Sequence, residues 1–183
     1  MIEERSAEKK ILDVGCGWNK TPGAIGIDSN AKTHADVIHD FGAIPYPFPE
    51  NEFDEIVCRH VIEHVPDVMA LVTELYRIAK PGGRITIVTP HYSDHSSYVS
   101  PTHRWHLSSF SLWFFSEDPG VYDYYAPAHF VQRRVRVRLL QMWRWLGFEL
   151  LVNASRRFRK MWENYLCFFV RGKHITWELE VKK

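Results

Sequence analysis

Two closely spaced glycines, Gly15 and Gly17, directly follow the apolar run at residues 10–14. Such glycines let bare backbone approach a ligand, and Asp28 at the end of the next apolar run could accept hydrogen bonds from both hydroxyls of a ribose. Asp28 comes only eleven residues after Gly17, and position 20 is Lys. A pyrophosphate site needs a helix and a third small residue at this point, so the pattern suits a nucleoside ligand without phosphate better than NAD. A plain tight turn with a capping Asp is the alternative interpretation.

A short run of titratable side chains, His60-x-x-Glu63-His64, follows the apolar stretch at residues 53–58. Two histidines four positions apart share one helix face and could ligate zinc, with the carboxylate assisting. The pattern is short enough to occur often by chance. We therefore favour the alternative, in which Glu63 and His64 organise a strand-to-helix turn by hydrogen bonds, and we predict no metal site.

A second group of polar and aromatic residues lies between positions 91 and 106. Four of the chain's ten histidines fall within these sixteen residues. Three interpretations stay open: a metal site, although the spacing matches no known ligand template; a lid that covers a substrate; and ordinary loop packing. The members are His91, Tyr92, Asp94, His95, Tyr98, His103, Arg104, Trp105 and His106.

Charge is divided unevenly along the chain, although the net charge is only +1. Residues 1–100 carry 15 acidic and 9 basic side chains, whereas residues 101–183 carry 7 acidic and 14 basic ones. Nine Arg or Lys and a single Glu occupy residues 131–160. This stretch predicts either a solvated basic face or a surface that attracts an anionic substrate or nucleic acid.

Aromatic residues follow the basic stretch and allow a nucleic-acid hypothesis. Trp143, Trp145, Leu146 and Phe148 could stack on RNA bases. Aromatic residues near a strand-helix junction are more often part of a core, so RNA binding stays the minority hypothesis.

The first ninety residues read as alternating strands and helices, which predicts parallel pairing with right-handed crossovers. A helix is expected at 67–80, where apolar residues recur at helical spacing, and Gly82 is suited to a left-handed cap that ends it. The expected strands of this half are residues 10–14, 24–28, 36–39, 53–58 and 84–89.

The second half is less regular. Residues 130–140 alternate strictly, which predicts a strand with Val131, Arg133, Val135, Val137 and Leu139 on one side and a wet basic face on the other, formed by Gln132, Arg134, Arg136 and Arg138. Helices are expected at 108–116 and 157–170, and a final strand at 175–181. With no linker in view, we expect one domain over residues 1–183 that carries an insertion or lid at about 91–128.

Composition excludes several classes of protein. The 183 residues contain three widely spaced cysteines, which favours free thiols over a disulfide framework. The first ten residues lack the apolar stretch of a signal peptide, and no apolar run approaches the length of a membrane span. We therefore expect a cytoplasmic protein without a membrane partner.

Several motifs, taken in order, resemble the class I S-adenosylmethionine-dependent methyltransferases of the type 11 group. Ile11-Leu12-Asp13-Val14-Gly15-Cys16-Gly17 resembles their first motif, and Ile25-Gly26-Ile27-Asp28 their second strand with its ribose-binding acid. The other matching segments are His39-Asp40-Phe41, Pro45–Phe48, Asn51–Asp54, His60–Val65 and Leu75–Gly83. The match spans residues 10–92 and departs from the family at Asn19, which replaces the usual third glycine.

The resemblance implies an α/β fold. Its three-layer Rossmann-like sheet would be mostly parallel with an antiparallel C-terminal strand, whereas the close spacing of Gly17 and Asp28 predicts a shortened first crossover helix, in which this chain departs from the family. It also implies S-adenosylmethionine as the cofactor, with the methionine end at Asp13, Gly15 and Gly17 and the ribose at Asp28. Asp40 and Phe41 would lie by the adenine, and Arg59 and His60 would face the sulfonium. Cys16, between the two glycines, completes the expected cofactor-binding set.

Methyl transfer from a sulfonium is an in-line displacement in which alignment and exclusion of water are the main tasks of the protein. A base is needed only where the acceptor loses a proton, and the candidates are His64, His91 and His95. Tyr92, His103, Arg104 and Trp105 are the expected substrate-side residues. The predicted acceptor is an N or O atom of a small or anionic molecule. A non-catalytic cofactor- or RNA-binding module and a His-ligated metalloenzyme are the rival hypotheses.

Overall fold

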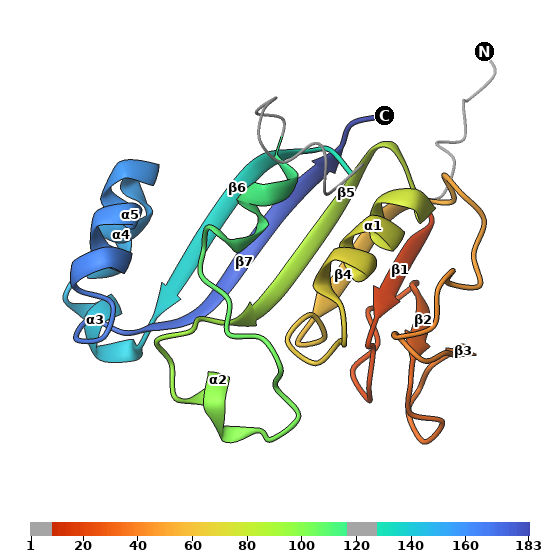
Figure 1. Ribbon diagram of the computed structural model, residues 1–183, viewed down its shortest axis with the longest axis horizontal. Coiled ribbons are helices and arrows are strands. Elements are labelled where there is room, and N and C mark those ends of the chain that lie inside the picture. The colour runs from red at the N-terminus through yellow and green to blue at the C-terminus, as the bar shows by residue number, and fades with distance from the viewer. Residues whose placement is uncertain (1–8, 117–127) are drawn as a thin grey trace, which may run out of the picture.

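A seven-stranded sheet forms the centre of the computed structural model, which describes residues 9–116 and 128–183 (Figure 1). The strand order is β3-β2-β1-β4-β5-β7-β6. Strands β1 to β5 pair in parallel, and β7 runs antiparallel to both β5 and β6. The expected fold class, a mostly parallel Rossmann-like sheet with an antiparallel last strand, is confirmed. The strands are β1 (Ile11–Val14), β2 (Ile25–Asp28), β3 (Val37–Ile38), β4 (Phe53–Arg59), β5 (Ala79–Pro90), β6 (Phe130–Leu139) and β7 (Gly172–Val181).

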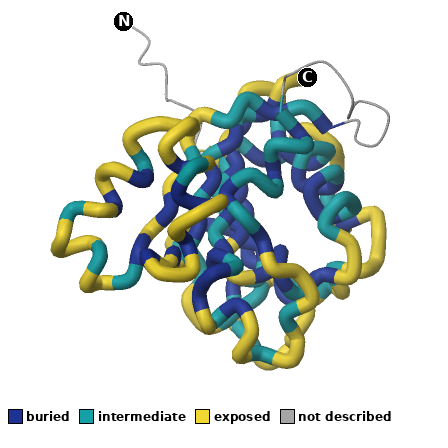
Figure 2. The backbone as a smooth tube through the Cα atoms, turned by 60° about the vertical axis from the view of Figure 1, so that its left-hand side comes forward, coloured by how far each residue is buried: buried dark blue, intermediate teal, exposed yellow. Residues whose placement is uncertain are grey.

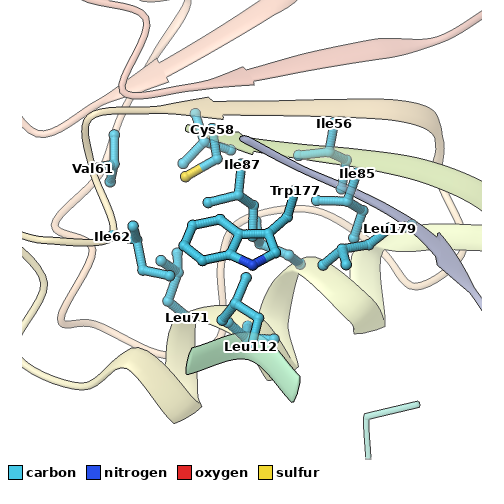
Figure 3. Close-up of a cluster of buried hydrophobic side chains, with 14 of the residues drawn as sticks. Ile56, Cys58, Val61, Ile62, Leu71, Ile85, Ile87, Leu112, Trp177 and Leu179 are labelled. Carbon is cyan, nitrogen blue, oxygen red and sulfur yellow. The ribbon is translucent and has the colours of Figure 1, made fainter. Parts of the chain in front are cut away.

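One face of the sheet is buried under helices. Cys58, Ile87 and Trp177 lie in one row across β4, β5 and β7, and all three are fully buried. Figure 3 shows the Trp177 ring among these side chains and against Leu71 and Leu112. These two leucines come from α1 (Val68–Ile78) and from the 3-10 helix η1 (Ser111–Phe115), which is shorter than the helix expected at 108–116.

The opposite face is polar and only partly covered. Its residues on the central strands, such as Thr86 and Glu178, are half-buried, and Arg84 and Arg136 are exposed. A cavity of about 520 Å³ opens on this face near the amino ends of β4 and β5. The crossover from β1 to β2, residues 15–24, contains no helix, in line with the short spacing before Asp28. Figure 2 shows how buried strands alternate with exposed loops along the chain.

Helix α1 ends earlier than its apolar periodicity predicts. Asp67 caps its first turn by accepting hydrogen bonds from the backbone N–H groups of Met69 and Ala70. The helix was expected to reach residue 80, but it ends at Ile78 because Ala79 already pairs with Phe53 in the sheet. Gly82 has the expected left-handed backbone (φ 72°), although it lies within β5, in the irregular stretch between Ala79 and Arg84, and does not cap the helix.

Strand β6 contains a bulge that the strict alternation of its sequence did not predict. The register with β7 shifts between Gln132 and Arg134, so Val131 lies opposite Glu180 while Phe130 is buried in the core. The guanidinium of Arg133 donates two hydrogen bonds to Glu180, at 2.7 and 2.8 Å. The prediction that Val131 and Arg133 share one face of the strand with Val137 is therefore wrong.

Side chains of two helices protect the free edge of β6. The Asn153 amide accepts from the N–H and donates to the C=O of Val137, each at 2.8 Å, and Glu149 accepts from the Leu139 N–H. Arg159 donates to the Val135 carbonyl at 3.0 Å. These contacts satisfy backbone groups that would otherwise pair with another strand. They come from α4 (Phe148–Ala154) and α5 (Arg156–Tyr165).

The remaining helices are short. α2 (Ser96–Val99) lies within the expected lid, and α3 (Gln141–Trp145) follows β6. Residues 117–127 of that expected lid lie outside the described part of the chain. The helix expected at 157–170 ends at residue 165, and the last strand begins at 172 and not at 175. No helix in the described residues is both long enough and apolar enough to cross a bilayer.

The edge contacts predict a specific loss of stability. Replacing Asn153 with Ala leaves both backbone groups of Val137 without partners, which we expect to lower the free energy of unfolding by about 1–3 kcal/mol. Asn164→Ala on the exposed side of α5 is the matched control and should change the free energy of unfolding by no more than about 0.5 kcal/mol. Urea unfolding followed by circular dichroism measures both variants. Equal losses for the two would show that Asn153 does not hold the edge.

Candidate functional site

The carboxyl ends of β1, β2, β4 and β5 meet at one edge of the sheet, the lower edge in Figure 1. Ligands of open parallel sheets bind beyond this edge. The glycine loop after β1, Asp28 at the end of β2 and the turn after β4 all lie there. Folding therefore gathers at one edge the residues that the sequence predicts to bind a nucleoside cofactor.

The glycine loop and Asp28 are joined by a hydrogen bond. Gly17 has a left-handed backbone (φ 52°), and its N–H donates to Asp28 Oδ2 at 2.9 Å. Asn30 N–H donates to Asp28 Oδ1 at 2.8 Å. Each carboxylate oxygen keeps a further lone pair, so the Asp28 carboxylate can still accept two hydroxyl groups.

The two glycines are required for different reasons. A Cβ atom added at Gly15 would lie 2.1 Å from Val61 Cγ2, whereas nothing lies within 4 Å of one added at Gly17. Val61 from the turn after β4 thus forces Gly15, and Gly17 offers open backbone. Cys16 between them is buried, and burial, followed by the charge of Asp28, raises the pKa of its thiol. Cys16 packs beneath the loop against Gly26 and does not face the open side.

A buried carboxylate lies on the other side of the loop. Asp13 Oδ2 accepts hydrogen bonds from the backbone and hydroxyl of Thr21, both at 2.7 Å, and from Arg59 Nη2 at 2.9 Å. Asp13 Oδ1 is also buried and has no hydrogen-bond partner within the described part of the chain. A buried, unpaired carboxylate oxygen is costly, and an ammonium group would satisfy it. The amino-acid end of S-adenosylmethionine carries such a group, so the residues present fit that cofactor.

The side chain of Arg59 reaches over the loop after β1, where it pairs with Asp13 and also contacts the Asn19 carbonyl and the Thr21 hydroxyl. A guanidinium at this point is suited to a carboxylate of a ligand, whereas a cation is unfavourable beside a sulfonium.

The expected adenine-side residues lie beyond β3. Asp40 is exposed, and its Oδ1 accepts a hydrogen bond from the Gly42 N–H at 2.9 Å. The half-buried ring of Phe41 packs against Tyr46, with centroids 6.0 Å apart. Both residues thus remain at the edge that carries Asp28.

A buried carboxylate organises the turn after β4. Glu63 is almost fully buried, and its two oxygens contact His60 Nδ1 at 3.2 Å and Thr89 Oγ1 at 2.9 Å. Burial alone would raise the pKa of Glu63, but hydrogen bonds from His60, its own backbone N–H and Thr89 outweigh burial and lower that pKa. Glu63 is therefore ionised at neutral pH and orients the His60 ring, whose side chain remains about half exposed.

The expected substrate-side segment docks on the same turn. The Glu63 carbonyl accepts hydrogen bonds from the backbone of Arg104 and Trp105, and the Trp105 ring donates to the Val65 carbonyl at 2.9 Å. His64 contacts Thr102 Oγ1 at 3.0 Å, and its ring lies 4.6 Å from that of His103. The structure therefore brings His64, His103, Arg104 and Trp105 together beside His60.

Three side chains of ligand type lie close together in this cluster. Glu63, His64 and His103 each offer one ligand atom, and these atoms lie within 4.8 Å of one another. Both oxygens of the Glu63 carboxylate already accept hydrogen bonds, from His60 and Thr89, so the observed role of Glu63 is to position His60. The expected absence of a metal here stays a prediction.

One of the three expected base candidates is enclosed in the interior. His91 is fully buried, with Nδ1 against the Ser93 hydroxyl at 2.8 Å and Nε2 against Glu163 at 3.2 Å, so neither nitrogen can reach a methyl acceptor. The Tyr92 hydroxyl donates to the Glu163 carbonyl and contacts Cys167 Sγ. His95 is exposed at the start of α2. His64 and His95 stay candidates from that set.

His60 and His174 form a pair that sequence reasoning missed. Their rings are 5.2 Å apart and nearly perpendicular. Burial, followed by the proximity of His60, lowers the pKa of His174, which keeps that ring neutral. The antiparallel pairing of β7 with β5 brings His174 opposite Pro90, and no local pattern in the sequence indicates that pairing.

The chain is similar in sequence to known methyltransferases. A family model described as a methyltransferase domain matches residues 1–179. Demethylmenaquinone methyltransferase of Anoxybacillus flavithermus is 40% identical over 52 residues, which cover 28% of this chain and 22% of that protein. Ubiquinone biosynthesis O-methyltransferase of Pseudomonas putida is 30% identical over 112 residues, covering 48% of each chain.

A solved structure supports the same fold. A SAM-dependent methyltransferase from Archaeoglobus fulgidus aligns with a TM-score of 0.62 at 16% identity and covers 95% of this chain and 86% of that one. The chain spans half or less of the length of the two curated relatives described above.

The different roles of the two glycines predict unequal costs of substitution. Alanine is strained in the left-handed backbone conformation of both glycines, which costs about 1–2 kcal/mol. Gly15→Ala adds a clash with Val61, whereas Gly17→Ala adds no clash. We expect Gly15→Ala to lower the free energy of unfolding by more than Gly17→Ala does, and Val61→Gly to recover part of that difference in the double variant. Thermal unfolding of the wild type, the two alanine variants and the Gly15→Ala, Val61→Gly double variant measures these differences. Equal destabilisation by the two alanines would contradict the assignment.

Proposed function

The chain belongs to the methyltransferase domain family with S-adenosylmethionine as cofactor, and we propose that it methylates an N or O atom of a small or anionic acceptor. The observation that carries this proposal is the hydrogen bond from the Gly17 N–H to Asp28, because a carboxylate directly beside open backbone is suited to the hydroxyls of a ribose. The names of the curated relatives, a ubiquinone biosynthesis O-methyltransferase among them, favour a small-molecule acceptor.

The cofactor would be held along the edge from β4 to β3. Asp13 Oδ1 and the Arg59 guanidinium would bind the ammonium and carboxylate of its methionine end. Asp28 would accept both ribose hydroxyls, and Asp40 and Phe41 would lie beside the adenine. The sulfonium then lies next to the turn after β4, where His60 is held by Glu63.

S-adenosylmethionine supplies a methyl group already activated by the positive sulfur. The protein must hold the acceptor in line with that methyl group and exclude water, and such positioning supplies up to about 7–11 kcal/mol. His103, Arg104 and Trp105 would form the acceptor side, with Arg104 attracting an anionic group. Residues 91–116, the described part of the expected lid, would cover the acceptor.

His60 is the base that the geometry favours. Its Nδ1 faces the ionised Glu63, so Nδ1 carries the proton and Nε2 is free to accept one. His60 Nε2 would accept the proton that the acceptor atom loses, while the cofactor would supply the methyl group and leave as a neutral thioether. Glu63 is the positioning residue that stabilises the charged imidazole. His64 is the second candidate base.

The ribose assignment predicts a loss of cofactor affinity. Asp28→Ala removes the acceptor of two hydroxyl hydrogen bonds, each worth about 1.5–3 kcal/mol to a charged group. We expect the Kd for S-adenosylmethionine, measured by calorimetry, to rise by at least about tenfold. Glu50→Ala, an exposed acid in the loop before β4, is the control and should leave the Kd unchanged. An unchanged Kd for Asp28→Ala would contradict the assignment.

The base assignment predicts a change in kcat without a change in cofactor affinity. His60→Gln should lower kcat by about 10²–10⁴-fold while the Kd for S-adenosylmethionine stays as in the wild type. The remaining activity should rise with pH as the acceptor ionises without help, and Glu63→Gln should lower kcat in the same direction. Steady-state kinetics against pH measure these effects. A wild-type kcat in His60→Gln would transfer the role to His64 or remove the need for a base.

A further inference from the structure

The helices between β6 and β7 expose many large apolar side chains. Trp145 is 80% exposed, Leu150 78%, Phe168 73% and Phe169 74%. Single exposed apolar residues are common, but several large ones gathered on α3, α4 and the turn after α5 form a candidate interaction surface. We call the group formed by Met142, Trp145, Leu146, Leu150, Phe168 and Phe169 the α3–α5 apolar patch.

Ring contacts join the segments that carry the α3–α5 apolar patch. Trp143 packs edge-on against Phe148, with centroids 5.5 Å apart, and lies 5.3 Å from Phe169. It therefore joins α3 to α4 and to the turn after α5. Phe168 lies 5.7 Å from Tyr92, the second residue after β5, so the patch extends to the carboxyl edge of the sheet. Figure 1 shows α3 at the same lower end of the molecule as α2.

Exposed charges beside the α3–α5 apolar patch are basic. Arg138 at the end of β6 and Arg171 and Lys173 at the start of β7 are exposed, and Arg144 projects from α3. The two acidic residues of this region, Glu149 and Glu163, are buried. Glu149 pairs with Arg136 and Arg144, and Glu163 with His91. The patch is thus apolar, and the exposed charged residues that form its rim are all basic.

We propose that the α3–α5 apolar patch docks this protein on the surface of an anionic lipid bilayer. Trp, Phe and Leu side chains that project from short helices, flanked by Arg and Lys, suit the boundary between headgroups and acyl chains. The basic rim complements anionic headgroups. Docking would turn the carboxyl edge, through Phe168 and Tyr92, toward the membrane. This inference stands independently of the proposed function.

Charge argues against a second copy of the chain as the occupant. A symmetric dimer formed through this face would bring the basic rim of one copy against that of the other, which is repulsive. An anionic bilayer meets the same face with opposite charge. A bilayer also accepts projecting side chains without a matching groove.

Sedimentation of the full chain with lipid vesicles tests the proposal. We expect binding to vesicles of phosphatidylcholine mixed with phosphatidylglycerol, weaker binding to phosphatidylcholine alone, and weakening with added salt. The triple-serine variant Trp145→Ser, Phe168→Ser, Phe169→Ser should lower the partition coefficient by at least about a hundredfold. The substitutions Arg171→Gln and Lys173→Gln should lower it by about fivefold for each charge removed.

A control and a second readout keep the result interpretable. Ile38→Ser replaces an exposed apolar residue at the opposite edge of the sheet and should leave vesicle binding unchanged, with circular dichroism confirming that all variants fold. Absence of binding to anionic vesicles, or equal binding by the triple-serine variant, would overturn the proposal. A dimer in light scattering that the triple-serine variant dissociates, or retention on single-stranded RNA in place of vesicles, would also overturn it.

Discussion

A buried carboxylate at the junction of β4 and β5 governs the candidate site. Burying an ionised Glu is costly unless its oxygens are paired, and Glu63 meets this condition through His60 and Thr89, which belong to different strand ends. Its backbone carbonyl in addition holds Arg104 and Trp105. One residue therefore fixes the end of β4, the end of β5 and the segment that covers both. The His60 ring owes its orientation to this arrangement, and the proposed proton transfer depends on that orientation.

The rest of the fold brings the strand ends to one edge of the sheet and uses few helices to connect them. No helix follows β1, and the loop is instead closed by polar contacts among Asp13, Thr21 and Arg59. The same contacts shape the proposed methionine end of the cofactor site, so the shortened crossover and the ligand chemistry share their residues. At the other end of the sheet, Asn153 and Glu149 take the place of a further strand along β6.

Local sequence patterns were sufficient to predict the features that depend on residues close to one another along the chain. The parallel strands, the helix before Pro81 and the gathering of the glycine loop and Asp28 at one sheet edge followed from apolar runs, turn residues and spacing. Contacts set by long-range pairing could not be predicted this way. At the bulge of β6, Arg133 pairs with Glu180 on β7, and His174 reaches His60 only because β7 lies beside β5. Trp145 and Leu146 were expected to favour a core, yet no element covers them in the described structure. His91 is an interior residue because α5 supplies Glu163.

A crystal structure with S-adenosylhomocysteine bound tests the central claim most directly. The account predicts that both ribose hydroxyls contact the Asp28 carboxylate, that the amino-acid end lies between Asp13 and Arg59, and that the sulfur faces the turn on which Glu63 holds His60. A ligand bound elsewhere, or a His60 ring turned away from the sulfur and released from Glu63, would contradict the account.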